Sequence, residues 1–144
     1  MPTMDMQTQL SAPPGVVYDF LADPSNETAW NPDVKAIRSV GERAWEGDYK
    51  GMGTMRIELV EAERPTRLLF RTTGSRMDML FEFRFAPARD GQATDLVAHG
   101  DATPKGAMKL MTPLMGAMFR RTMAKRPGQM ADALATDAAR RRGA

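Results

Sequence analysis

Residues 76–85 read RMDMLFEFRF, and apolar and polar side chains largely alternate along this stretch. A period of two is typical of a strand that buries one side and exposes the other. The apolar side carries Met77, Met79, Phe81, Phe83 and Phe85. Clean alternation favours an antiparallel sheet that is covered on one face only. We therefore expect a layered fold in which helices cover the apolar face of a sheet.

The stretches on either side of residues 76–85 extend this sheet. Asp90-Gly91 is a strong hairpin signal and leads into a last strand. Gly51 and Gly53 lie inside one long predicted strand, where glycines indicate a bend or a close approach of two backbones. The predicted strands cover residues 4–10, 34–40, 49–62, 67–73, 76–85 and 92–102, with a turn over 41–47.

Two short helices are expected between the first strand and the second. The first begins near Pro13-Pro14, and Asp23-Pro24 ends it. The second ends near Trp30-Asn31-Pro32. From Lys105 onward, apolar residues recur at three- and four-residue steps, which predicts one long C-terminal helix. The fold class is therefore α+β, with about six antiparallel strands and helices on one face.

Two prolines lie within the predicted long helix, Pro113 and Pro127. Each removes one backbone donor and is expected to kink or interrupt the helix. This spacing suggests the hypothesis that residues 108–119 form a movable lid section and that residues 123–134 are better anchored.

Length and composition predict a single domain over residues 1–137, followed by a basic, flexible tail over 138–144. The chain has 144 residues and no cysteine, which excludes disulfides and thiolate metal sites. Polar residues interrupt the N-terminal stretch, so we do not expect a signal peptide there. No stretch approaches the roughly 20 apolar residues that a membrane-spanning helix needs, so no integral membrane association is expected. These features favour a cytoplasmic protein.

Charge is distributed unevenly along the chain. The net charge is only +2, but residues 105–144 contain nine basic and two acidic residues. Such asymmetry is typical either of one solvated basic helix face or of a surface that contacts an acidic partner. Few aromatic residues accompany the basic ones, so we expect no nucleic-acid partner.

The element order resembles that of the polyketide cyclase/dehydrase branch of the START-like, or SRPBCC, superfamily. The resemblance rests on residues 12–24, which read APPGVVYDFLADP, and on Trp30-Asn31-Pro32. The paired glycines of residues 49–55, the stretch 63–68, the Asp90-Gly91 hairpin and the long helix agree with it. It implies a helix-grip fold, in which a strongly bent antiparallel sheet wraps round the long helix and leaves a cavity between them. Members of this superfamily bind lipids, sterols, polyketides or other apolar molecules, and a minority are enzymes. They share no catalytic signature, so the resemblance assigns no catalytic residue.

Few residues are candidates for chemistry. His99 is the only histidine, and strand parity turns it outward, away from the small apolar residues of its strand. No metal site or cofactor is expected, because no set of residues has the spacing of metal ligands or of a phosphate-binding loop. Tyr49, Arg71, Asp78 and His99 are the groups that could exchange protons with a substrate, and no catalytic residue is assigned.

The parity of the strands and the apolar stripe of the long helix predict which residues line a pocket. Methionine is frequent among them, and its flexible, polarisable side chain suits a surface that adapts to a ligand, although it also fills irregular gaps in a core. The predicted lining residues are Tyr49, Met55, Ile57, Phe70, Thr72, Met77, Met79, Phe81, Met111, Met115, Met118, Phe119 and Thr122.

Three functions follow as hypotheses. The leading one is binding of a lipid, polyketide or other apolar small molecule in a cavity between the sheet and the C-terminal helix. The second is a polyketide-type cyclase or dehydratase, which requires an ionisable group that points into the cavity. The third is an interaction module that uses the basic helix and the Arg140–Arg142 tail to contact an acidic partner, anionic lipid or nucleic acid. The sequence leaves open whether the chain forms a homodimer.

Overall fold

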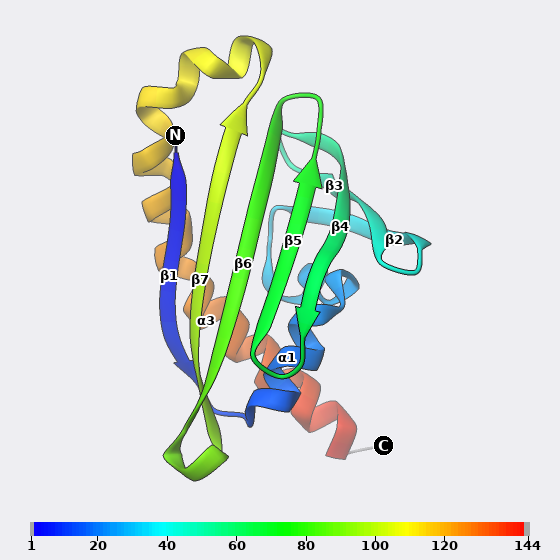
Figure 1. Ribbon diagram of the computed structural model, residues 1–144, viewed down its shortest axis with the longest axis vertical. Helices are drawn as coiled ribbons and strands as arrows, with labels where there is room; N and C mark the ends of the chain where they lie inside the picture. Colours follow the sequence, from blue (N-terminus) through cyan, green and yellow to red (C-terminus); the bar gives the residue numbers. More distant parts are fainter. Residues whose placement is uncertain (1, 143–144) are drawn as a thin grey trace.

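The computed structural model describes residues 2–142, and its main element is one seven-stranded antiparallel sheet (Figure 1). The order of the strands across the sheet is β1-β7-β6-β5-β4-β3-β2. The strands are β1 (Thr3–Leu10), β2 (Val34–Gly41), β3 (Ala44–Tyr49), β4 (Gly53–Glu63), β5 (Arg67–Thr73), β6 (Met77–Ala88) and β7 (Ala93–Pro104). The sheet is bent, and a register shift between Leu59 and Glu61 of β4 is the kind of bulge that bends a strand.

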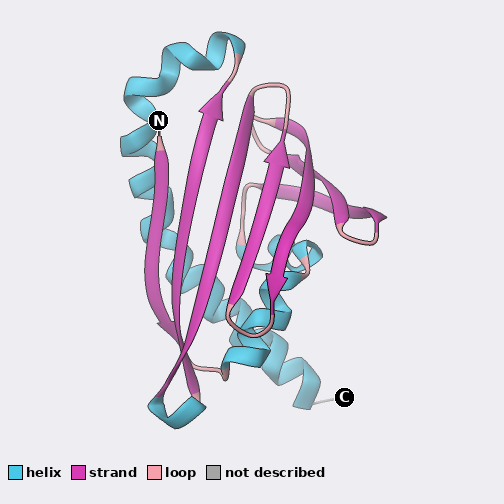
Figure 2. Ribbon diagram, in the orientation of Figure 1, coloured by secondary structure: helices cyan, strands magenta, loops and turns pink. Residues whose placement is uncertain are grey.

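The helices lie on one face of this sheet, except for a short 3₁₀ helix in the turn between β6 and β7 (Figure 2). They are α1 (Pro14–Ala22), η1 (Pro24–Asn26), α2 (Glu27–Trp30), η2 (Arg89–Gly91), η3 (Gly106–Met111) and α3 (Thr112–Arg142), where η marks a 3₁₀ helix. The long helix α3 crosses the covered face from the end of β7 toward α1. The α+β helix-grip fold expected from the sequence is confirmed.

The sheet has one strand more than the sequence predicts. Residues 41–47, expected as a turn, contain the end of β2 and most of β3, so the predicted strand over 49–62 begins at Gly53. Gly47 resembles a turn residue in the sequence, but it lies inside β3. A Cβ atom there would come within 2.7 Å of the Tyr49 ring, so the glycine makes room for that ring.

The C-terminal region also differs in detail from the prediction. It divides at Thr112, where η3 ends and α3 begins, and this places Pro113 in the first turn of α3. Proline is tolerated there because the first backbone N–H groups of a helix have no partner within the helix. Pro127 lies inside α3, which continues on both sides of it. Residues 138–142 of the predicted tail are part of α3, and residues 143–144 lie outside the described residues.

Two apolar clusters hold the layers together. The larger one joins the sheet, α1 and the C-terminal half of α3, and Leu68 and Leu96 are fully buried in it. The smaller one lies under the first turns of α3 and contains Met4, Met77 and Met115. Within residues 2–142, no helix combines the length and the apolar composition that crossing a membrane requires.

A cavity between the sheet and the long helix

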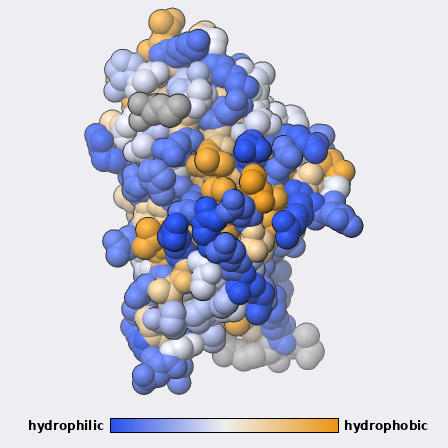
Figure 3. All heavy atoms as spheres, viewed as in Figure 1, coloured by the Kyte–Doolittle hydropathy of each residue, from blue (hydrophilic) through white to orange (hydrophobic). Residues whose placement is uncertain are grey.

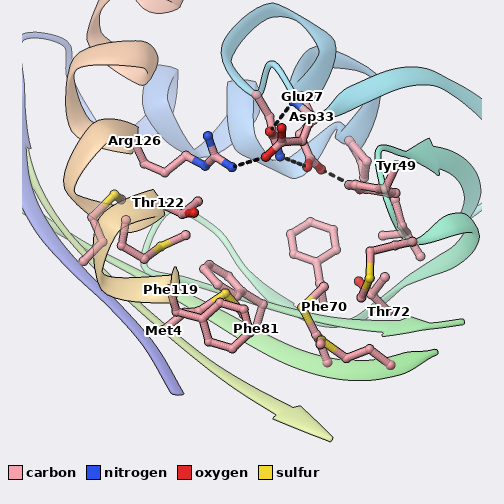
Figure 4. Close-up of a pocket in the computed structure, with 18 of the residues that line it drawn as sticks. Met4, Glu27, Asp33, Tyr49, Phe70, Thr72, Phe81, Phe119, Thr122 and Arg126 are labelled. Carbon is pink, nitrogen blue, oxygen red and sulfur yellow. Dashed lines mark hydrogen bonds and ion pairs between the residues drawn. The ribbon is translucent and has the colours of Figure 1, made fainter. Parts of the chain in front are cut away.

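A cavity of about 400 Å³ lies where the two apolar clusters meet. Its walls come from the concave face of the sheet, from α2 and from α3. Half of the residues that line it are methionine or phenylalanine, and Figure 4 shows Phe70, Phe81 and Phe119 pointing into it. The volume is within the range that small-molecule sites occupy, roughly 300–1,000 Å³.

Eleven of the thirteen residues predicted to line a pocket line this cavity. They are Tyr49, Ile57, Phe70, Thr72, Met77, Met79, Phe81, Met115, Met118, Phe119 and Thr122. The other two lie elsewhere. Met55 is only 1% exposed and packs beneath Gly74, and Met111 is part of η3, where it is 39% exposed.

One end of the cavity is polar, and its central group is the carboxylate of Glu27. The Tyr49 hydroxyl donates a hydrogen bond of 3.0 Å to Glu27 Oε1, and Asn31 Nδ2 donates one of 2.8 Å to Oε2. Glu27 as a residue is only partly buried, but its carboxylate faces inward, and both of its oxygens accept hydrogen bonds from buried or half-buried residues. At this end the wall thus carries a carboxylate that two neighbouring side chains hold by hydrogen bonds.

Arg126 of α3 approaches the same end of the cavity, as Figure 4 shows. Its side chain is 8% exposed, which is unusual for arginine. Nη1 donates to Gln129 Oε1 at 2.7 Å, and Nη2 lies 3.5 Å from Asp33 Oδ2. The partner Asp33 is half exposed, so the ion pair joins the cavity to the surface.

The local sequence explains why α2 presents Glu27 to the cavity. Pro24 keeps Asp23 extended, and the Asp23 carboxylate accepts hydrogen bonds from the backbone N–H and the hydroxyl of Ser25. After α2, the Asn31 side-chain oxygen accepts the Asp33 N–H at 3.0 Å, which forms a tight turn. These contacts hold η1 and α2 together as one short helical segment between Asp23 and Asn31.

Burial sets the ionisation of this polar end. Loss of water raises the pKa of Glu27, and the hydrogen bonds from Asn31 and Tyr49 and the charge of Arg126 only partly offset it. The pKa of Tyr49 is also raised, chiefly by burial and then by the neighbouring Glu27 carboxylate. A carboxyl group that holds its proton more tightly than usual can donate it to a bound oxygen atom.

The other candidates for proton exchange lie away from the cavity. His99 is 45% exposed on the outer face, as its strand parity predicts, and its ring nitrogens contact Asp5 at 2.6 Å and Asp101 at 3.1 Å. Arg71 is exposed on β5, and Asp78 pairs with Lys105 at 2.7 Å. Within residues 2–142, no three His, Asp or Glu side chains gather as metal ligands would.

Sequence reasoning missed Glu27, Asn31, Asp33 and Arg126. Arg126 follows Lys125 in a helix rich in basic residues, and nothing local distinguishes the buried arginine from its exposed neighbour. The available signal was the resemblance over residues 12–32, because its Asp-Pro and Trp-Asn-Pro motifs mark the two ends of the helical segment that carries Glu27.

A family model described as "Polyketide cyclase / dehydrase and lipid transport" matches residues 1–137. The chain belongs to this family. The resemblance drawn from the sequence is thereby confirmed over nearly the whole chain. No curated protein matches the sequence significantly.

Several solved structures share the fold. A conserved protein from Geobacillus kaustophilus is 17% identical, with a TM-score of 0.76, over 93% of this chain and 95% of its own. A START superfamily protein from Mycobacterium smegmatis is 15% identical, with a TM-score of 0.71, over 92% and 93%. The Zhui aromatase/cyclase from a Streptomyces species is 18% identical, with a TM-score of 0.67, over 96% and 94%. At these identities the likeness shows the fold alone.

Proposed function

We propose that this protein binds an apolar small molecule, such as a lipid, a polyketide or another apolar metabolite, in the cavity between the sheet and α3. The observation that carries the proposal is a space of about 400 Å³ with walls rich in methionine and phenylalanine and charged groups gathered at one end. Burial of apolar ligand surface contributes roughly 25 cal/mol per Å². An apolar molecule that fills the cavity therefore gains most of its affinity from the methionine and phenylalanine walls.

The polar end orients the ligand in this proposal. Arg126 and the Tyr49–Glu27 pair gather charged and polar groups at one end, so an elongated ligand places its oxygen there and its apolar part among the aromatic rings. A few polar groups in an apolar wall are the usual source of orientation in such sites.

Binding of N-phenyl-naphthylamine, an apolar dye that fluoresces strongly in apolar surroundings, tests the proposal. Thr122 lines the cavity from α3, so Thr122→Trp fills it. Thr136 is exposed on the same helix, so Thr136→Trp is a matched control. We expect Thr122→Trp to weaken dye binding about tenfold or more, which corresponds to about 1.4 kcal/mol, and Thr136→Trp to leave it unchanged. Equal binding by both variants would contradict the proposal.

A second function, catalysis of a cyclase or dehydratase type, is favoured by one observation. Glu27 is an acid with a raised pKa that lines the apolar cavity and accepts a hydrogen bond from Tyr49. In an aldol cyclisation, such an acid protonates the carbonyl oxygen that is attacked, and the carboxylate left behind accepts the proton released from the attacking carbon. This returns Glu27 to its starting state.

Incubation with a linear poly-β-ketone thioester, followed by mass spectrometry of the products, tests the second function. Glu27→Gln keeps the shape and the hydrogen bond to Asn31 but cannot transfer a proton. Cyclised or dehydrated product from the original chain and none above background from Glu27→Gln is the expected result. Product formation equal to that of a protein-free sample, or unchanged in the variant, would refute catalysis by Glu27 and leave the binding proposal to its own test.

A further inference from the structure

Four apolar side chains are exposed around the junction of η3 and α3. Leu110 is 84% exposed, Leu114 58%, Met118 53% and Met111 39%. We call these four residues the apolar tip. An isolated exposed leucine needs no explanation, but several neighbouring apolar side chains on a protruding segment indicate a contact surface.

The apolar tip borders the opening of the cavity. Met118 is half exposed and also lines the cavity, and Met108 and Met115, close to the tip in sequence, line it as well. The β3–β4 turn at Lys50–Met52 also lines the cavity. Figure 1 shows η3 and the β5–β6 turn at the same end of the molecule, and in Figure 3 this end carries apolar side chains beside strongly hydrophilic ones.

The stretch of sequence that contains the tip has several basic residues and no acidic ones. Residues 102–131 contain six lysines and arginines and no aspartate or glutamate. Within the described part of the chain, the ion pairs that this stretch forms use only Lys105 and Arg126. Lys109, Arg121 and Lys125 are exposed, and the last two follow Leu114 at helical spacing. One side of α3 therefore begins apolar and becomes basic along its length.

We propose that the apolar tip and the basic residues beside it bind the surface of a membrane that contains anionic lipids. Leucine and methionine side chains enter the boundary between head groups and acyl chains, and lysine and arginine lie at the level of the phosphates. In this orientation on the membrane, the opening of the cavity faces the bilayer.

A second copy of the chain fits this surface less well. A symmetric dimer through the tip would bring the exposed Lys109, Arg121 and Lys125 of one copy close to those of the other, with no acidic residue in either stretch to offset their repulsion. An anionic bilayer complements both the charge and the apolar side chains.

Flotation with vesicles tests the inference without knowledge of the cavity ligand. One set of vesicles contains phosphatidylcholine alone, and the other contains equal parts of phosphatidylcholine and phosphatidylglycerol. The tip variant is Leu110→Ser with Leu114→Ser, and its control is Val97→Ser, a 43% exposed residue on β7. The charge variant is Arg121→Ala with Lys125→Ala, and its control is Lys35→Ala with Arg43→Ala, both exposed near β2 and β3. Circular dichroism confirms that every variant is folded.

We expect binding to the anionic vesicles only. The charge variant should bind roughly 30-fold more weakly, about fivefold for each charge removed, and the tip variant should lose binding, while both controls keep it. Absence of binding to either vesicle would overturn the inference. Binding that the tip and charge variants leave unchanged would also overturn it, as would a dimer that the tip variant abolishes in a protein that binds no vesicles.

Discussion

Replacing Tyr49 with phenylalanine removes one hydroxyl group from the polar end of the cavity. That hydroxyl donates to Glu27 Oε1 at 3.0 Å, and Tyr49 is itself held by its fit over Gly47. The ring stays in place in the variant, but Glu27 Oε1 loses a donor in an apolar surrounding. An unsatisfied buried acceptor costs about 1–3 kcal/mol, so we expect the free energy of unfolding to fall by that amount.

The effect should depend on pH. The Tyr49 hydrogen bond lowers the pKa of Glu27, which burial otherwise raises, so the variant raises this pKa further. The stability linked to a carboxyl with a raised pKa is fully present below the unfolded-state pKa, about 4.3, and is lost as pH rises through the folded-state pKa. The loss caused by Tyr49→Phe should therefore be larger at about pH 8 than at about pH 5.

Urea unfolding followed by circular dichroism at both pH values measures this difference. Tyr18→Phe is the matched control, because Tyr18 is 4% exposed and its hydroxyl makes no hydrogen bond to any residue from 2 to 142. The control should lose much less stability, with little dependence on pH. Equal losses in the two variants, or a Tyr49→Phe loss that is the same at both pH values, would refute the assignment of Glu27 as a buried acid supported by Tyr49.

Other predictions concern the sheet. A Cβ atom at Gly100 would lie 2.4 Å from the Phe81 ring, so Gly100→Ala should push that ring, destabilise the fold by about 1–3 kcal/mol and weaken dye binding; an unfolding curve identical to the original would contradict the tight contact. Leu68 is fully buried, and Leu68→Ala should cost about 2–5 kcal/mol in urea unfolding, whereas a cost below that range would mean that the core closes around the gap. The hydrogen bond to Asp5 raises the pKa of His99. The stability that this pair contributes is therefore present below about pH 6.5 and is lost as pH rises through the folded-state pKa of His99. Because both side chains are about half exposed, His99→Gln should remove less than about 1 kcal/mol of pH-dependent stability, and a larger change would disprove the exposed placement.

Periodicity predicted the parts of the fold that each segment determines by itself. The alternation along residues 76–85 gave the correct buried positions for Met77, Phe83 and Phe85, and strand parity turned His99 outward. The spacing of apolar residues predicted α3, because a helix that buries one face repeats apolar residues at helical spacing whatever it packs against.

The polar end of the cavity could not be predicted in this way. Arg126 is buried because α2 and Asp33 lie against α3. Glu27 gains its contact with Tyr49 only when β3, 22 residues later in the chain, lies beside α2. Such pairing depends on tertiary packing. The extra strand β3 was missed because Gly47 suggested a turn; in the fold, the glycine leaves room for the Tyr49 ring and for Ile37 of the neighbouring strand β2.

Native mass spectrometry of the protein purified from its own host tests the central claim most directly. If the cavity binds an apolar molecule, the spectrum should show a consistent added mass that organic extraction removes, and Thr122→Trp, which fills the cavity, should lack it while Thr136→Trp keeps it. A bare protein mass in every preparation, or an added mass that Thr122→Trp retains in full, would contradict the account.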